Sequence, residues 1–285
     1  MPDYRARIED RTFVLLTAVA SAASELQIGW LIAGAAGRVL LLEEVYKLPP
    51  GRATEDVDYG VMVDSWDHYQ ALVERICKDE RVYKDRKQTQ RLHFSDYGII
   101  DLVPFGGVES DGNVIRWPPD GDFVMSVAGF QEAYDNAVQV LVNDTLMIRV
   151  VSPVGLLLLK LVAWGERHNI QPRKDAADIA YVLRHSPALF GETSLFEEHF
   201  EIVESAGYDL ELAAARLLGQ KMSALASERT RKHVCKLLEQ ELNNGIESKL
   251  VRQVAESLVP AERTRTYELL SQIMIGLAES RGQTT

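Results

Sequence analysis

Two aspartates two residues apart, Asp56 and Asp58, form the pattern with the clearest chemical meaning in this sequence. They stand at the start of an apolar run, 57–63, that is rich in strand formers, and alternate residues of a strand share a face. Two carboxylates at such a short distance repel each other unless a cation neutralises them or one of them takes a proton. Because Mg²⁺ prefers oxygen ligands, the pair predicts a site for a hard divalent metal. The alternative interpretation is a solvated strand end.

Asp101 is a third candidate ligand. It is the single carboxylate inside the apolar run 99–105, where burial without a partner would be costly. If this strand pairs beside the strand at 57–63, Asp101 reaches the same pocket and provides a third carboxylate for one or two ions.

A glycine turn, 34–37, separates a short apolar run at 30–33 from a helical pattern at 38–46. Free backbone N–H groups and the positive end of a helix dipole favour an anion at such a turn. Taken alone, the small residues are equally well explained by a tight strand-to-helix connection. Together with the aspartates, they indicate a site for a metal-bound polyphosphate.

The elements that must position these residues follow from the hydrophobic periodicity. We expect helices at 8–26, 38–46 and 66–78, strands at 30–33 and 57–63, a hairpin of 89–94 and 99–105 around the turn 95–98, a long loop at 106–121, and two strands within 138–151. Beyond Pro153, apolar residues recur every three or four positions over 153–166, 174–184 and most of 210–279, which predicts helices. We therefore expect an α+β protein with one domain at 1–150 and a mainly helical domain at 151–285.

The composition narrows the function classes. The 285 residues carry a formal net charge of −11, which argues against a non-specific polyanion binder but leaves room for a local basic patch. Cys77 and Cys235 are the only cysteines, and the histidines have no ligand spacing, so neither a disulfide framework nor a zinc site is indicated. We find no signal peptide and no apolar stretch of membrane-spanning length, and we expect a cytoplasmic protein without a membrane partner.

Four segments in this order, IAGAAGR, RATEDVD, IIDLVPFG and LLKLVAWGERHNIQPRKDAADIAYVL, resemble the AbiEii/AbiGii-type toxin nucleotidyltransferases of the DNA polymerase β-like superfamily. The resemblance spans roughly residues 30 to 183. It implies a nucleotidyltransferase-fold mixed sheet with flanking helices and assigns metal binding to Asp56, Asp58 and Asp101. Where the superfamily usually has Gly followed by Gly or Ser, this chain has Gly34-Ala35, which removes a possible hydroxyl donor.

The resemblance also implies further site residues. We expect nucleotide contacts at Gly34, Ala35, Arg38, Arg52, Thr54, Lys160 and Arg167, catalytic roles for the three aspartates, Lys160 and Asp175, and membership of the family motifs for Lys174 and Asp178.

The residues themselves leave alternatives open for the last group. Lys160 interrupts an apolar helical run, so its ammonium must either reach solvent or meet an anion, and Arg167 can share its helical face. Asp175 and Asp178 lie one helical turn apart, where they could equally stabilise the first turn of a helix through its dipole.

The resulting hypothesis is a nucleotidyltransferase dependent on Mg²⁺, or on Mn²⁺, that transfers a nucleoside monophosphate from an NTP to a hydroxyl and releases pyrophosphate. The resemblance implies an RNA acceptor, particularly the tRNA acceptor end, with growth arrest as the result and a cognate antitoxin as partner. A basic run supports RNA binding, although a solvated surface segment is the commoner explanation; it comprises Arg81, Lys84, Arg86, Lys87 and Arg91, with Tyr83 for stacking. The alternatives are a protein or small-molecule acceptor and a non-catalytic nucleotide-binding module.

Overall fold

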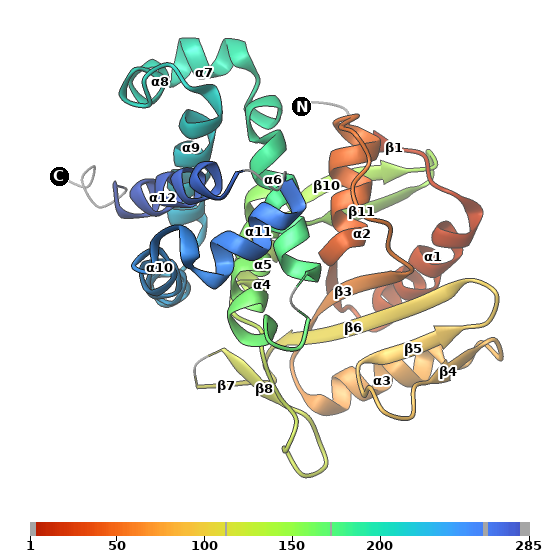
Figure 1. Ribbon diagram of the computed structural model, residues 1–285. Helices are drawn as coiled ribbons and strands as arrows, with labels where there is room; N and C mark the ends of the chain where they lie inside the picture. The colour runs from red at the N-terminus through yellow and green to blue at the C-terminus, as the bar shows by residue number, and fades with distance from the viewer. Residues whose placement is uncertain (1–3, 112, 172, 259–261, 280–285) are drawn as a thin grey trace. The chain divides into compact units, whose positions relative to one another are not determined.

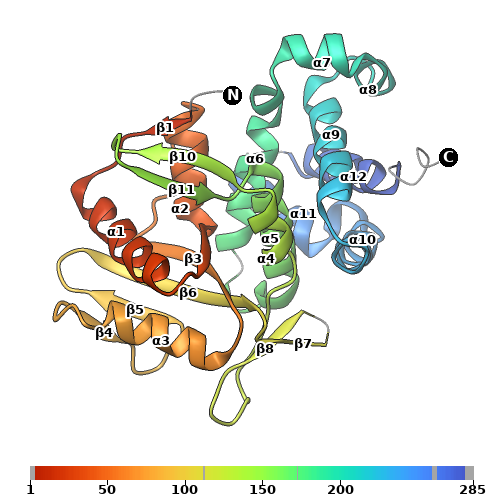
Figure 2. The ribbon, with the colours of Figure 1, turned by 180° about the vertical axis from the view of Figure 1, so that it is seen from behind.

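The computed structural model describes residues 4–111, 113–171, 173–258 and 262–279. Contacts divide the chain into two compact units, Met1–Ser152 and Pro153–Thr285, and Figures 1 and 2 show the elements of each unit from opposite sides. Among the described helices, none combines the length and the apolar character needed to span a membrane.

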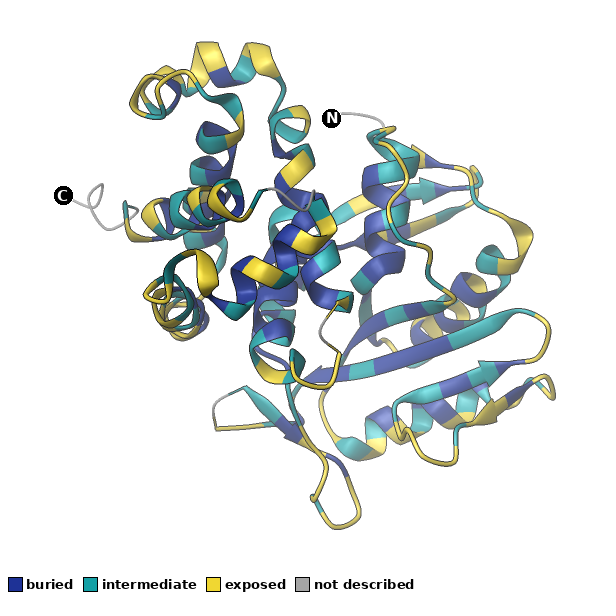
Figure 3. Cartoon of the chain, in the orientation of Figure 1, coloured by how far each residue is buried: buried dark blue, intermediate teal, exposed yellow. Residues whose placement is uncertain are grey.

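The first unit is built on a mixed sheet, as the resemblance implies, with eight strands where the sequence predicts six. Its strands follow the spatial order β1 (Arg5–Ala6), β10 (Val138–Val142), β11 (Leu146–Val150), β2 (Gly29–Ile32), β3 (Asp56–Val63), β6 (Gly98–Gly106), β5 (Arg91–Phe94) and β4 (Val82–Lys84). The central pair, β3 and β6, is parallel, whereas β6 and β5 form the expected antiparallel hairpin. Figure 3 shows buried residues running along both central strands.

The helices of the first unit are α1 (Asp10–Glu25), α2 (Gly34–Arg38), η1 (Val39–Val45), α3 (Trp66–Ile76) and α4 (Phe130–Asp135). α1 and α3 lie side by side and contact β6 and β3, respectively. The apolar stripe of α1 explains this packing, because Leu16, Val19 and Ala23 are fully buried. Ser65 caps α3 by accepting a hydrogen bond from the His68 backbone N–H.

The prediction of a long loop at 106–121 is partly wrong. It contains β7 (Glu109–Ser110) and β8 (Val114–Arg116), which join β9 (Val124–Ser126) in a small antiparallel sheet. The Gly and Pro residues of this segment suggest a loop, yet Ile115 and Trp117 are buried, and Trp117 packs against Trp66. Burial of these side chains therefore outweighs the local turn signals.

The helix expected at 38–46 begins earlier than the periodicity indicates. α2 begins at Gly34, directly after β2, and continues as the π-helical segment η1 as far as Val45. The glycine turn is thus the first turn of the helix.

The second unit is entirely helical in its described residues, which confirms the expected change after Pro153. Its helices are α5 (Pro153–Arg167), α6 (Lys174–Phe190), α7 (Glu192–Glu198), α8 (Phe200–Ser205), α9 (Leu210–Leu225), α10 (Glu228–Leu242), η2 (Gly245–Glu247), α11 (Lys249–Leu258) and α12 (Arg263–Glu279).

The backbones of α9 and α12 approach closely at Gly219 and Gly276. A Cβ atom at Gly219 would lie 2.2 Å from the Ile273 carbonyl oxygen, so only glycine allows this packing.

Candidate metal and nucleotide site

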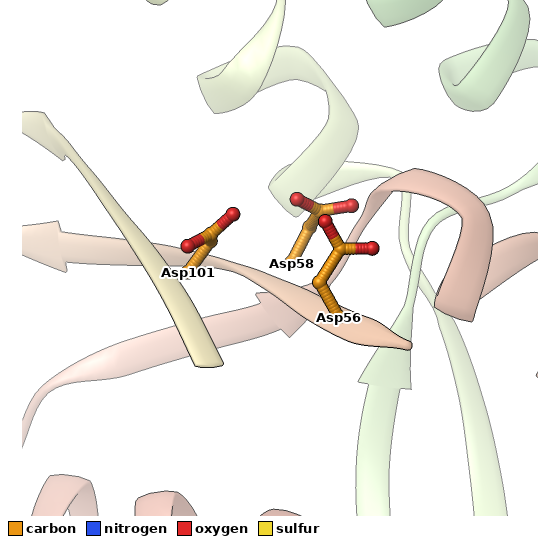
Figure 4. A group of neighbouring side chains, drawn as sticks. All are labelled: Asp56, Asp58 and Asp101. Atoms are coloured by element: carbon orange, nitrogen blue, oxygen red, sulfur yellow. The ribbon is translucent and has the colours of Figure 1, made fainter. Parts of the chain in front are cut away.

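Three carboxylates lie together on the central strands of the sheet. Because β3 and β6 are parallel neighbours, Asp58 stands directly opposite Asp101, and Asp56 lies two residues earlier on the same face as Asp58. One oxygen from each side chain falls within 4.8 Å of the others. Figure 4 shows the three side chains rising from the same side of the two strands. The strand pairing on which the third ligand depended is therefore present.

The alternation along these strands separates the carboxylates from the core. Tyr59, Ile100 and Leu102 are fully buried and point to the opposite face. The Asp56 side chain is 14% exposed and that of Asp101 only 10%. Such low exposure does not fit a solvated strand end, and the clustered negative charge requires cations.

One such cation is Arg91, on β5, which stands opposite Asp101 in the hairpin register. Its Nε and Nη2 atoms donate to the two oxygens of Asp101 at 2.7 and 2.6 Å, and Nη2 lies 3.5 Å from Asp56 Oδ2. The hydrogen bonds to Asp101 are the largest of the effects that raise the pKa of Arg91.

Arg91 was expected only as part of the basic run, and its contact with Asp101 was not predicted. The signal was available, because a hairpin turn at 95–98 pairs residue 91 with residue 101 or its neighbour.

Thr54 supports the site from the segment that precedes β3. Its hydroxyl donates to Asp56 Oδ1 at 2.6 Å, which fixes the orientation of that carboxylate. Thr54 was expected to contact the nucleotide, and the structure places it beside a candidate metal ligand.

The glycine turn touches the aspartates directly. Gly34 has a φ angle of +58°, and a Cβ atom built on it would lie 1.8 Å from Asp58 Oδ2. In addition, the Ala33 backbone N–H donates to the Asp58 carbonyl oxygen at 2.8 Å. Only glycine therefore fits at position 34, and the two sequence motifs form one site.

Arg38, which was expected to contact the nucleotide, has a structural role. Its side chain is fully buried, pairs with Glu43, and donates from Nη2 to the Arg52 carbonyl oxygen at 2.5 Å. Glu43 also accepts the Gly51 backbone N–H at 3.0 Å. Arg38 therefore anchors the segment leading into β3, and its contact with nucleotide stays a prediction. Ala35 is fully buried as well, so its methyl group belongs to the core.

Four further predicted residues, all in the second unit, pair with one another: Lys160, Arg167, Asp175 and Asp178. Lys160 Nζ, on α5, lies 3.2 Å from Asp175 Oδ1 and 2.8 Å from Asp178 Oδ2, both on α6. Arg167 also binds Asp175, with Nε and Nη2 at 2.6 and 2.7 Å from its two oxygens. A contact of these residues with nucleotide stays a prediction.

The burial of this cluster decides between the two alternatives for Lys160. Lys160 is 4% exposed, so its ammonium meets anions and does not reach solvent. Asp175 lies in the first turn of α6, where the helix dipole also favours its charge, and Asp178 is 1% exposed and pairs with Lys160. Burial tends to raise the pKa of Asp175, but the hydrogen bond from Arg167 and the charges of Lys160 and Arg167 outweigh it, and the pKa is lowered.

The donor set at Asp56, Asp58 and Asp101 fits Mg²⁺ or Mn²⁺. All three ligands are hard carboxylate oxygens, and their spread of 4.8 Å is close to the largest separation, about 4.2 Å, between oxygens bound to one Mg²⁺. Small rotations of the side chains, or two ions, would complete the coordination.

No family model matches the chain, and no curated protein matches it. Several solved structures show distant similarity. The antibiotic-resistance factor ANT(2'')-Ia in solution matches with 13% identity and a TM-score of 0.37, covering 70% of this chain and 99% of that one. ANT(2'')-Ia in complex with adenylyl-2''-tobramycin matches with 17% identity and a TM-score of 0.38, covering 68% and 95%. The Thermotoga maritima CCA-adding enzyme complexed with tRNA matches with 12% identity and a TM-score of 0.27, covering 97% and 85%.

Proposed function

We propose that this protein is a metal-dependent nucleotidyltransferase that transfers a nucleoside monophosphate from an NTP to a hydroxyl acceptor. One observation carries the proposal: Asp56, Asp58 and Asp101 present oxygens within 4.8 Å of one another, directly against the Gly34 turn. In this reaction the acceptor oxygen bonds to the α-phosphorus, the bond to the bridging oxygen breaks, and pyrophosphate leaves. The proton of the acceptor hydroxyl passes to water.

The residues of the first unit suit this chemistry, which depends on positioning and charge neutralisation rather than on a protein nucleophile. The three aspartates would hold Mg²⁺ or Mn²⁺, which when bound neutralises charge on the attacking and leaving oxygens. Thr54 orients Asp56, and Arg91 orients Asp101. The missing side chain at Gly34 leaves room for Asp58 and lets the backbone of the turn approach a phosphate.

An RNA acceptor is favoured by an aromatic pair on the same face of the sheet. Tyr83 stacks on His93 with ring centroids 5.0 Å apart and an interplanar angle of 10°, and Asp85 holds His93 at 2.7 Å. Strand register places Tyr83, His93 and Ile99 in one cross-strand row with Asp56. Three strand spacings separate Tyr83 from Asp56, about 14 Å. Because Tyr83 is 56% exposed, its ring is open to a nucleobase.

The residues around this pair add positive charge. Lys84, Arg86 and Lys87 are exposed in the same hairpin. Such cations favour the binding of a nucleic-acid phosphate backbone, despite the acidic net charge of the chain. The sequence resemblance extends the proposal to the acceptor end of tRNA and to a toxin that is neutralised by a cognate antitoxin.

The proposal is tested by incubating the full chain with each α-³²P-labelled NTP, Mg²⁺ and total RNA, with protein-only and EDTA controls. We expect label on RNA from the wild type and none from Asp58→Asn, which keeps its shape but loses a ligand charge. Label on protein without RNA would replace the RNA acceptor with a protein acceptor. Absence of transfer to RNA, protein and small hydroxyl compounds would leave a non-catalytic nucleotide-binding module.

A further inference from the structure

Arg91 forms ion pairs with two members of the aspartate cluster, Asp56 and Asp101. Its guanidinium reaches two of the three aspartates, with both oxygens of Asp101 bound and Asp56 at 3.5 Å. It therefore sets one fixed positive charge against the negative charges of the carboxylates. A fixed positive charge at this position opposes the binding of a second cation to the same carboxylates.

We propose that Arg91 is a positioning residue that weakens the binding of bare metal and makes metal loading depend on the nucleotide. The inference rests on the proposed metal site. Its basis is the repulsion between two cations, the guanidinium and the metal ion, that lie beside the same carboxylates.

The fold holds Arg91 in this place. Backbone pairing sets Arg91 opposite Asp101, and the short turn between β5 and β6 fixes that register. The Arg91 side chain is 19% exposed, and its two parallel hydrogen bonds to Asp101 define the direction of the guanidinium plane. The charge is thus built into the site and is not supplied by a freely moving surface residue.

Both cations can nevertheless use Asp101. Each carboxylate oxygen has two lone pairs, and Arg91 occupies one on each oxygen, which leaves one on each for a metal ion. The electrostatic penalty remains, because the guanidinium and the ion lie near each other with the same sign. A triphosphate removes that penalty, since it adds several negative charges and further oxygen ligands.

The comparison that tests this inference uses two arginines of the same β-hairpin. Arg91→Gln removes the charge that faces the aspartates. Arg81→Gln removes an equal charge nearby, but Arg81 pairs with Asp79, at 2.9 and 2.7 Å, and not with the cluster. Arg91→Lys keeps the positive charge but loses the planar guanidinium that donates two parallel hydrogen bonds.

Binding of Mn²⁺ alone is measured on the full chain by calorimetry, and circular dichroism verifies that each variant is folded. We expect Arg91→Gln to bind bare Mn²⁺ at least about tenfold more tightly than the wild type, because one nearby positive charge is lost. Arg81→Gln and Arg91→Lys should stay within about threefold of the wild type. Should Arg91→Gln unfold, Arg91→Met serves as the charge-removing variant.

A second titration adds a non-hydrolysable NTP. The wild type should bind Mn²⁺ much more tightly with the nucleotide than without it, and Arg91→Gln should show a smaller difference. The inference is overturned if Arg91→Gln binds bare Mn²⁺ no more tightly than the wild type, or if Arg81→Gln changes the affinity equally. A role in packing alone would make Arg91→Lys behave like Arg91→Gln, which also overturns it.

These outcomes are separable from the proposed function. If the wild type transfers nucleotide and binds Mn²⁺ with NTP, yet Arg91→Gln leaves the affinity for bare Mn²⁺ unchanged, only the role of Arg91 is lost. If neither the wild type nor any Arg91 variant binds Mn²⁺ with or without NTP, the metal site itself fails, and both proposals fall.

Discussion

The ammonium of Lys160 lies 2.8 Å from Asp178 Oδ2, and both side chains are almost fully buried inside the helical unit. The two residues come from α5 and α6. Asp175, which lies about one helical turn before Asp178 on α6, also pairs with this ammonium. An ion pair buried to this degree stabilises the fold only while both partners are present, since removal of one leaves the other charged in a medium of low polarity.

Replacing Lys160 with methionine should therefore destabilise the protein. Loss of the ammonium leaves Asp178 buried without that cation, and the expected cost is about 3–5 kcal/mol of the free energy of unfolding. Urea denaturation measures this cost. Lys232→Met is the matched control, because Lys232 is 63% exposed and pairs with Glu228 on the surface of α10, so its loss should change stability by less than about 0.5 kcal/mol. Equal stability of the two variants would contradict the structural role of Lys160.

The stability of the helical unit should fall in acid. Because the pKa of Asp175 is lowered in the folded protein, its contribution is present above the unfolded pKa, near 4, and is lost as the pH falls through the lower folded value. Denaturation curves at pH 7 and at several values below pH 4 should show this loss. Asp175→Asn should weaken the dependence, whereas Glu239→Gln, at an exposed position, should leave it unchanged.

Substitution of Gly34 by alanine should damage the site more than the fold. A methyl group there would collide with Asp58 Oδ2, besides the strain of a φ angle of +58°. Gly245→Ala is a close control, since Gly245 has a φ angle of +59° and open space around its Cα. Both variants should lose about 1–2 kcal/mol of stability from the backbone conformation. Only Gly34→Ala should lose nucleotide transfer and Mn²⁺ binding, and normal transfer by this variant would separate the glycine turn from the site.

Tyr83 should contribute to RNA binding through its ring. Tyr83→Ala is expected to weaken the binding of a single-stranded RNA oligonucleotide by about 5- to 150-fold, the range that corresponds to the stacking of one base, while Tyr83→Phe keeps the affinity. Fluorescence anisotropy measures both. Tyr208→Ala removes a ring of similar exposure, 58%, from the helical unit and should have no effect. Unchanged affinity of Tyr83→Ala would remove the stacking contact from the proposal.

Parts of the site could be read from short stretches of sequence. The spacing of Asp56 and Asp58 placed both on one face of a strand, because side chains alternate along an extended backbone. The turn at 95–98 defined a hairpin, and with it the approximate register that brings Arg91 to Asp101. The small residues at 34–37 marked a strand-to-helix connection, although the helix includes that turn. In each case the relevant residues are near neighbours in the chain.

Other parts depended on contacts between distant segments. The sequence did not show that β3 and β6 are neighbours, which requires a parallel pairing of strands 43 residues apart at Asp58 and Asp101. It left open the partner of Lys160, which is set by the packing of α5 against α6. It also gave no sign that packing would bury the Arg38 side chain against Glu43.

The sequence by itself therefore determined the kinds of chemical group present and the direction in which each points from its own strand or helix. The tertiary structure decided which distant groups meet: Asp101 with Asp58, and Lys160 with Asp178. The physical reason is that side-chain direction follows from local backbone geometry, which a few residues specify. Partners across the fold instead follow from the burial of apolar surface summed over many residues, and no short segment encodes that sum.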